Sequence, residues 1–469
     1  MATSKVSSFH LDAMVVELAA LEDIALEFVN STAQSMDAGA ASAFRSKCET
    51  LIKEGQLQTL VETFVDALEK VGAAGSLQDT ESRFAILFSL ARHLPADVLS
   101  QSVVPRISKV VVGLPSKDAG QKEQDDSMRI GILRNLYSVL DARAPARFGT
   151  LTAMVEFALK SQAFTILDGT SALDIEELCS LWGGSSEEVV NRKRKLHRSF
   201  ADLCEAKART GLSPDELRST ELKQQRFLTK LLESYEGGAI DADVLPYAAR
   251  AALIAVKYPL PGDMAESNTL EEHSLTGMKR AAAAVLAAEQ TAKVDWSSLT
   301  ASASAIAQFS AIKALADSGS HKVLFQLLSI FAAEGLDEFQ SFAKANPTAI
   351  NDLGLSEDAC LKNIRFLTLA SLAANSETVS YTTIASKLQV DSAEVETWVI
   401  EGITCKVIDA KMDQLNQTIV INRGSQRLLT DRQWEDVHAK LVSWKENVGS
   451  LLATIKSVRQ EQLLLAQQQ

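Results

Sequence analysis

The chain has 469 residues, of which 46% are hydrophobic, and its formal net charge at pH 7 is -13. This hydrophobic content excludes an intrinsically disordered protein and leaves room for about two to four folded domains. The negative charge excludes a chain-wide basic surface for nucleic acid, so any such contact has to be local.

Helices dominate the first half of the chain. Apolar residues recur at helical spacing from Leu11 to Val29 and in shorter stretches up to Glu205, with Gly, Ser or Asp between them. The small residues of Ser31–Ser42 are expected to break the first helix, and the polar stretch Pro115–Ser127 is expected to form an exposed loop. Helical pairs without a fixed repeat length predict an α-solenoid, to which we assign residues 1–207.

One strongly basic run lies in this region. Its cations are Arg192, Lys193, Arg194, Lys195 and Arg198. Such a run could contact RNA phosphates or act as a nuclear-import signal. A solvated helix face balanced by Glu187 and Glu188 is the alternative that we favour, because helices tolerate such runs at little cost.

Residues 208–358 are predicted to form the helical part of the next domain. The run Tyr258-Pro259-Leu260-Pro261 stops one helix, and helices rich in Ala and Ser are expected between Met278 and Leu315. Two more helices, within Val323–Ala343, precede Asn346-Pro347. The small side chains of this region suit closely stacked helical hairpins.

Residues 359–425 are predicted to form a winged helix, because helical spacing gives way to strand spacing near their end. Helices are expected over Lys362–Ala374, Thr382–Leu388 and Ser392–Lys406. Two strands joined by the polar turn Asp413–Gln417 follow them. Three helices and a hairpin are the elements of a winged helix.

The last of these helices is expected to start at Asp391, because Glu394 follows three residues later. Its apolar residues expected to be buried are Val395, Val399, Ile400 and Ile403, or their near neighbours. On the first helix, Lys362 and Arg365 are expected to face water.

A winged helix suggests DNA binding, but the charges of its third helix argue against it. That helix carries Glu394, Glu396 and Glu401 against the single cation Lys406. These carboxylates would repel phosphates in a DNA groove. The sequence therefore favours protein–protein assembly.

Residues 429–469 are predicted to form one long helix with an unbroken apolar seam. The helix opens at Thr430, and apolar residues follow in alternating steps of three and four. The seam consists of Trp434, Val437, Leu441, Trp444, Val448, Leu451, Ile455 and Val458. Because leaving such large apolar side chains in water costs about 1.5 to 3 kcal/mol each, we expect helices of partner proteins to cover the seam.

No pattern in the chain predicts catalysis, a metal or a cofactor. The six histidines, which include His197, show no H-x-H or H-E-x-x-H spacing, and no phosphate-binding loop or nucleophile elbow occurs. Gly183-Gly184 is interpreted as the break before a helix capped by Ser185 and Glu188. We therefore predict a non-catalytic protein without cofactors.

Cysteine usage and the lack of long apolar runs bear on localisation. The chain has five cysteines and no C-x-x-C pair, which favours reduced thiols. No run approaches the roughly 20 apolar residues of a membrane span, and the N-terminus lacks the apolar core of a secretory signal. We expect a protein of the cytoplasm or nucleus, with no membrane partner.

A helical solenoid followed by a winged helix and a long helix resembles the PCI domain family, named for the proteasome lid, the COP9 signalosome and eukaryotic initiation factor 3. Within it, the chain is most similar to the M-subunit family of eukaryotic translation initiation factor 3. The segments that carry the resemblance are Met128–Tyr137, Ile350–Leu355, Lys411–Gln414 with Val420-Ile421, Gln433-Trp434 and Leu441–Asn447.

The resemblance implies a cytoplasmic, non-catalytic scaffold. Members of the family pack their winged helices edge to edge into an arc and gather their C-terminal helices into a bundle. The implied partners are other PCI-domain subunits of initiation factor 3 and, through the complex, the small ribosomal subunit, to which the factor helps recruit mRNA and initiator tRNA. A scaffold subunit of the COP9 signalosome or the proteasome lid is the alternative.

Overall fold

The computed structural model describes most of the chain: residues 21–71, 77–114, 122–237, 240–260, 303–319, 321–424, 435, 438–439, 441–452 and 454–455. These residues divide into two compact units. Unit 1 holds described residues of 21–254 together with 309–315, and unit 2 holds those of 255–260, 303–308 and 316 onward. The predicted division of the chain into four parts remains a prediction.

Unit 1 is entirely helical in its described part. Its helices are residues 21–33, α2 (Ala38–Lys53), α3 (Leu57–Val71), α4 (Leu77–Ala91), α5 (Ala96–Val98), α6 (Val104–Gly113), α7 (Lys122–Val139), α8 (Ala146–Ser161), α9 (Ala172–Leu181), α10 (Ser186–Ala208), α11 (Pro214–Glu233), most of α12 (Leu245–Lys257) and α17 (Ser310–Lys313). A π-helical turn (Leu99–Val103) joins α5 to α6, and 3-10 turns cover Phe164–Gly169 and Ala242–Val244.

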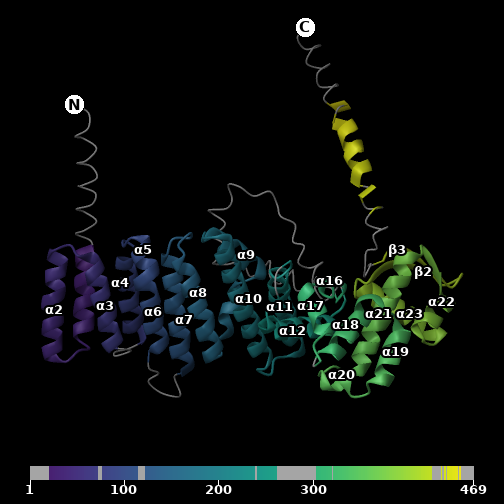
Figure 1. Cartoon of the computed structure of the whole chain (residues 1–469), viewed down its shortest axis with the longest axis horizontal. Helices are drawn as coiled ribbons and strands as arrows, with labels where there is room; N and C mark the ends of the chain where they lie inside the picture. The colour runs from purple at the N-terminus through teal and green to yellow at the C-terminus, as the bar shows by residue number, and fades with distance from the viewer. Residues whose placement is uncertain are drawn as a thin grey trace, which may run out of the picture. The chain divides into compact units, whose positions relative to one another are not determined.

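Helices of unit 1 pack mainly on their neighbours in the chain, as expected for a solenoid. Figure 1 shows α2 to α11 side by side in chain order. Aromatic side chains fill the interior between neighbours: the rings of Phe28 and Phe64 stack at 4.0 Å, and those of Phe200 and Phe227 at 5.2 Å. This region confirms the predicted helical fold class.

Two predicted breaks in unit 1 are wrong in their extent. The break after the first helix spans only residues 34–37, and α2 runs through the small residues of Ala38–Ser42. Alanine is the best helix former, so a run of small residues need not end a helix. Within the predicted loop Pro115–Ser127, residues from Lys122 onward already belong to α7. The loop's first residues lie outside the described part.

Unit 2 combines helices with a small sheet. Its elements are α16 (Ala303–Ile306), α18 (Lys322–Ala333), α19 (Leu336–Ala345), α20 (Ala349–Asp352), α21 (Glu357–Asn375), β1 (Thr378–Ser380), α22 (Tyr381–Leu388), α23 (Val395–Thr404), β2 (Ile408–Asp413) and β3 (Thr418–Gly424). A 3-10 turn, Ala314–Ala316, lies between the units in the chain, and another, Ser392–Glu394, precedes α23. The predicted Ala/Ser-rich helices lie mostly outside the described residues.

The sheet has the strand order β1-β3-β2, with both pairs antiparallel. Ile419 of β3 pairs with Val379 of β1 and with Met412 of β2. Because side chains alternate across a strand, Ile419 is buried while its neighbour Val420 is 41% exposed. Helices α21, α22 and α23 with this sheet form the predicted winged helix.

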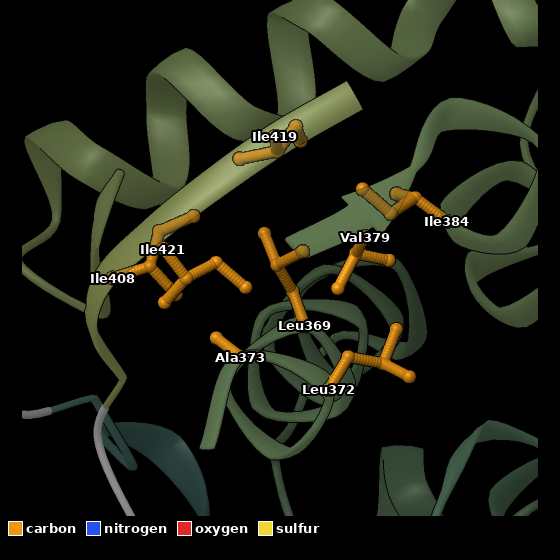
Figure 2. Close-up of a pocket in the computed structure, with 8 residues that line it drawn as sticks. All are labelled: Leu369, Leu372, Ala373, Val379, Ile384, Ile408, Ile419 and Ile421. Atoms are coloured by element: carbon orange, nitrogen blue, oxygen red, sulfur yellow. The ribbon is translucent and has the colours of Figure 1, made fainter. Parts of the chain in front are cut away.

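Apolar side chains from every layer meet in the interior of the winged helix (Figure 2). Leu369, Leu372 and Ala373 come from α21, and aliphatic residues of β1, α22 and the hairpin face them. They enclose a cavity of about 10 Å³. A void of this size with apolar walls stays dry, because a water there would lack hydrogen-bond partners.

Two expectations about the winged helix are wrong in detail. Asp391 precedes α23 but caps nothing with its side chain, because a 3-10 turn intervenes. Lys362 of α21 is exposed as expected, but Arg365 is only partly exposed and is not left to water. Lys362 pairs with Glu401 at 2.9 Å, and the Arg365 guanidinium donates to the Leu388 carbonyl at the end of α22. Both side chains therefore hold α21 to its neighbours.

Candidate assembly surfaces

The C-terminal helix carries the first candidate surface, its apolar seam. Residues 441–452 are helical without interruption, and residues 454 and 455 are helical as well. Five seam residues lie in the described part and are exposed by 55% to 67%, namely Leu441, Trp444, Val448, Leu451 and Ile455. The other three, Trp434, Val437 and Val458, lie outside the described residues. Figure 1 draws this helix in yellow.

Most exposed apolar residues share one face of the helix, and Val442, 41% exposed, lies outside it. At about 100° per residue, the five described seam residues and Leu452 fall within an arc of about 100°, with Ser443 and Ser450 on the opposite side. Burying the exposed part of these side chains against other helices would contribute on the order of 1 kcal/mol per residue to the free energy of association. The geometry is therefore that of a helix suited to pack against other helices.

The third helix of the winged helix presents a second surface, acidic with an apolar centre. Ile400, which the sequence predicted to be buried, is 51% exposed, whereas Val395 and Val399 are fully buried. The Ile400 side chain faces outward because Val399 and Gly402 occupy the side of α23 that meets α21 and β2. Sequence spacing placed Ile400 within the apolar stripe but could not show where the stripe's edge lies.

Carboxylates surround this face, and two of them have partners within the module. Glu396 accepts hydrogen bonds from the Tyr381 hydroxyl and from Gln414 at the hairpin tip, at 3.4 and 3.1 Å. Glu401 pairs with Lys362. These carboxylates lie on the helix that enters the groove in DNA-binding winged helices, where they would face phosphates.

The sheet and its hairpin offer further apolar surface that sequence reasoning missed. Strands β1 and β2 are its edges, so each has one side without a strand partner in the described residues. Leu415 at the hairpin tip is 93% exposed, and Val420 lies on the outward face. The strict alternation within β3 was the signal that could have placed Val420 outside.

The basic run of α10 is largely engaged within unit 1. Arg192 donates to the Gly183 carbonyl at 2.7 Å, and Lys193 donates to Glu176 at 2.5 Å. Lys195 lies 3.4 Å from Glu156, with both side chains more than half exposed. An RNA contact by the run remains a prediction.

The two remaining cations of the run pack on tyrosine. Arg194 donates to the Ser234 carbonyl at 2.6 Å, and its guanidinium lies 3.7 Å from the centre of the Tyr235 ring. Arg198 donates to the Tyr235 hydroxyl at 2.6 Å. These contacts attach α10 to the end of α11, so the predicted solvated face is in part a structural interface.

A charged group in the interior between α9 and α10 was not foreseen. His197 is fully buried, and its Nε2 lies 2.9 Å from Glu176, which also binds Lys193. Burial lowers the pKa of His197, so we assign the neutral ring with its proton on Nε2, donating to Glu176. Burial raises the pKa of Glu176, but hydrogen bonds from His197 and Lys193 outweigh it and lower this pKa to about 2. The carboxylate is therefore ionised.

Within the described ranges, no group of three His, Cys, Asp or Glu side chains could hold a metal ion. All five cysteines are described and none forms a disulfide. Among the described helices, none is long and apolar enough to cross a membrane.

Two family models match the part of the chain that carries these surfaces. Residues 343–423 match the family model of the PCI domain, and residues 427–455 match that of the C-terminal helix of initiation factor 3 subunit M. The first match covers the winged helix, and the second covers most of the seam.

Similarity to characterised relatives extends over most of the chain. The protein is 25% identical to eukaryotic translation initiation factor 3 subunit M of Dictyostelium discoideum, over 82% of this chain and 81% of the relative. It is 28% identical to the subunit M of an Aspergillus fumigatus strain, over 83% and 73%, and 26% identical to that of Aspergillus clavatus, over 94% and 85%. With the winged helix and the seam on which they fall, these matches show that the chain belongs to the family of eukaryotic translation initiation factor 3 subunit M.

Proposed function

We propose that this protein is a non-catalytic structural subunit of the eukaryotic translation initiation factor 3 complex. Its winged helix and C-terminal helix join it to other subunits. The observation that carries the proposal is the row of five seam residues, each more than half exposed, on a helix that matches the C-terminal helix of subunit M. The C-terminal helix match favours this complex over the COP9 signalosome or the proteasome lid.

Two kinds of contact support assembly. The seam provides an apolar stripe for a bundle with helices of other subunits. The winged helix provides the edge of β2, whose outer main-chain groups can pair with a strand of a neighbouring PCI domain. We assign residues 1–207 and 208–358 to the helical support, 359–425 to the winged helix and 429–469 to the bundle helix.

At the level of the complex, the protein supports the recruitment of mRNA and initiator tRNA to the small ribosomal subunit in the cytoplasm. Its contribution there is architectural, because the proposal gives it no catalytic step. A direct contact between RNA and the run Arg192–Arg198 is a separate proposal. It is tested by the salt dependence of RNA binding before and after the charges are neutralised.

The assembly proposal is tested by placing charge on the seam. The double variant Trp444→Asp/Leu451→Asp is expected to lower co-purification with the other subunits at least tenfold, because two carboxylates would be buried in the bundle. The matched control Ser443→Asp/Ser450→Asp adds the same charge on the opposite face and is expected to assemble normally. Wild-type assembly of the seam variant would contradict the proposal.

A further inference from the structure

A polar cleft of about 430 Å³ opens between α10, the end of α11 and the start of α12 in unit 1. Its walls carry opposite charges. Arg194, Lys195 and Arg198 line one side, and Asp241 and Asp243 line the other. The volume falls within the range of pockets that hold small ligands or a few side chains of a partner.

The cationic side is built rather than incidental. The Arg194 and Arg198 guanidiniums are held by the Ser234 carbonyl and the Tyr235 hydroxyl, both neutral acceptors. Neither arginine forms an ion pair with a carboxylate in the described part of the chain. The Nε of Arg198 is buried without a hydrogen-bond acceptor. Two fixed cations without ion-pair partners are suited to bind a carboxylate.

The anionic side is likewise uncompensated. Asp241 and Asp243, at the start of the 3-10 turn before α12, are exposed and form no ion pair among the described residues. A third acid of the cleft, Asp202, differs because Arg250 binds it at 3.0 Å. Charges of opposite sign thus face the same cleft without pairing with each other.

We propose that this cleft is a docking site for a segment of a partner protein that carries an acidic and a basic side chain. The partner's carboxylate binds between Arg194 and Arg198, and its cation binds Asp241 and Asp243. RNA fits less well, because the two aspartates would repel phosphates that the arginines attract. The inference rests on the proposed function, in which partners are subunits of the same complex.

The test uses the full chain co-expressed with the other subunits of the complex. One arm reverses the anionic side with Asp241→Lys/Asp243→Lys, which removes no described contact within the fold. The other changes the cationic side with Lys195→Glu/Arg198→Gln. The control Glu187→Lys/Asp215→Lys reverses two exposed acids of the same unit outside the cleft. Circular dichroism melting verifies folding, and the apparent Kd of assembly is measured for each variant.

Both cleft variants are expected to raise the apparent Kd at least tenfold, whereas the control stays within twofold. Unchanged assembly of the aspartate variant would overturn the cleft proposal and leave the proposed function standing. Failure of the wild-type chain to assemble would overturn both. A 20-residue oligouridylate serves as the RNA probe. If the aspartate variant binds the oligouridylate more tightly while assembly is unchanged, the cleft binds RNA and the proposal is wrong.

Discussion

The interiors of the winged helix and of the α9–α11 region are built from different residues. In the winged helix, Leu369, Val379 and Ile419 are at most 7% exposed and contact only apolar neighbours around the cavity. In the α9–α11 region, His197 is fully buried with its ring 6.2 Å from that of Phe227, which stacks on Phe200, and Gln225 of α11 is buried as well. The side chains around the cavity of the winged helix are held by packing alone, whereas those buried in the α9–α11 region are also held by hydrogen bonds.

This difference shows for which residues burial can be predicted from the sequence. Apolar periodicity marks the winged helix because its core contains no polar side chain among the residues that line the cavity. A buried polar group is stable only with its partner, and that partner lies on another helix. His197 depends on Glu176 of α9, and Gln225 of α11 donates to the Ala251 carbonyl of α12 at 3.1 Å.

The largest effect is expected from breaking the apolar interior. Ile419→Ala should lower the free energy of unfolding of the winged helix by about 3 kcal/mol, because a large side chain is lost from a closely packed core. Val420→Ala, at the adjacent outward position, should cost less than about 1 kcal/mol. Hydrogen exchange of the β3 and α21 amides measures both without assuming that the whole chain unfolds at once. Equal losses would contradict the packing described here.

A smaller effect is expected from the charged interior, and it depends on pH. The pKa of Glu176 in the folded chain is about 2, below its usual 4.5, so the unfolded chain binds the proton more tightly. The carboxylate therefore stabilises the fold above pH 4.5, and this contribution is lost as the pH falls from 4.5 to 2. Glu176→Gln should cost about 2 kcal/mol at pH 7 and little near pH 2.

His197 also makes the fold less stable as the pH falls, but over a higher pH range than Glu176. Its pKa is lowered by burial, so its stabilising contribution begins to fall as the pH drops below its usual 6.5. The control Glu177→Gln removes an exposed carboxylate on the same helix and should change stability little at any pH. Hydrogen exchange of α10 amides between pH 7 and pH 3 gives the comparison. A constant difference between Glu176→Gln and wild type across this range would contradict the assigned charge.

These contrasts explain which features were predictable. The helices of the winged helix, its hairpin and the capping boxes at Ser185 and Ser213 follow local rules. All of these except the capping box at Ser213 were predicted. The seam was found because the periodicity of a helix does not depend on its partner. The contacts of Arg194 with the Tyr235 ring and of Arg365 with the Leu388 carbonyl were not predictable, because each joins residues 23 or more positions apart.

The smallest effect is expected at Gly402 of α23, where close packing and helix propensity oppose each other. A Cβ there would lie 3.0 Å from the Leu369 Cδ2 and 3.6 Å from the Ile408 Cγ1. Both side chains line the small cavity of Figure 2, which gives the Leu369 methyl group room to shift by a few tenths of an ångström.

Gly402→Ala should therefore change the stability of the winged helix by no more than about 0.5 kcal/mol. The gain of roughly 0.5 to 1 kcal/mol from replacing glycine within a helix offsets the crowding of Leu369. Gly402→Val should cost at least about 2 kcal/mol, because its branched side chain exceeds the space that the cavity offers. Hydrogen exchange of the α21 and α23 amides measures both. A similar loss for alanine and valine would show that the cavity cannot accept the displaced methyl group.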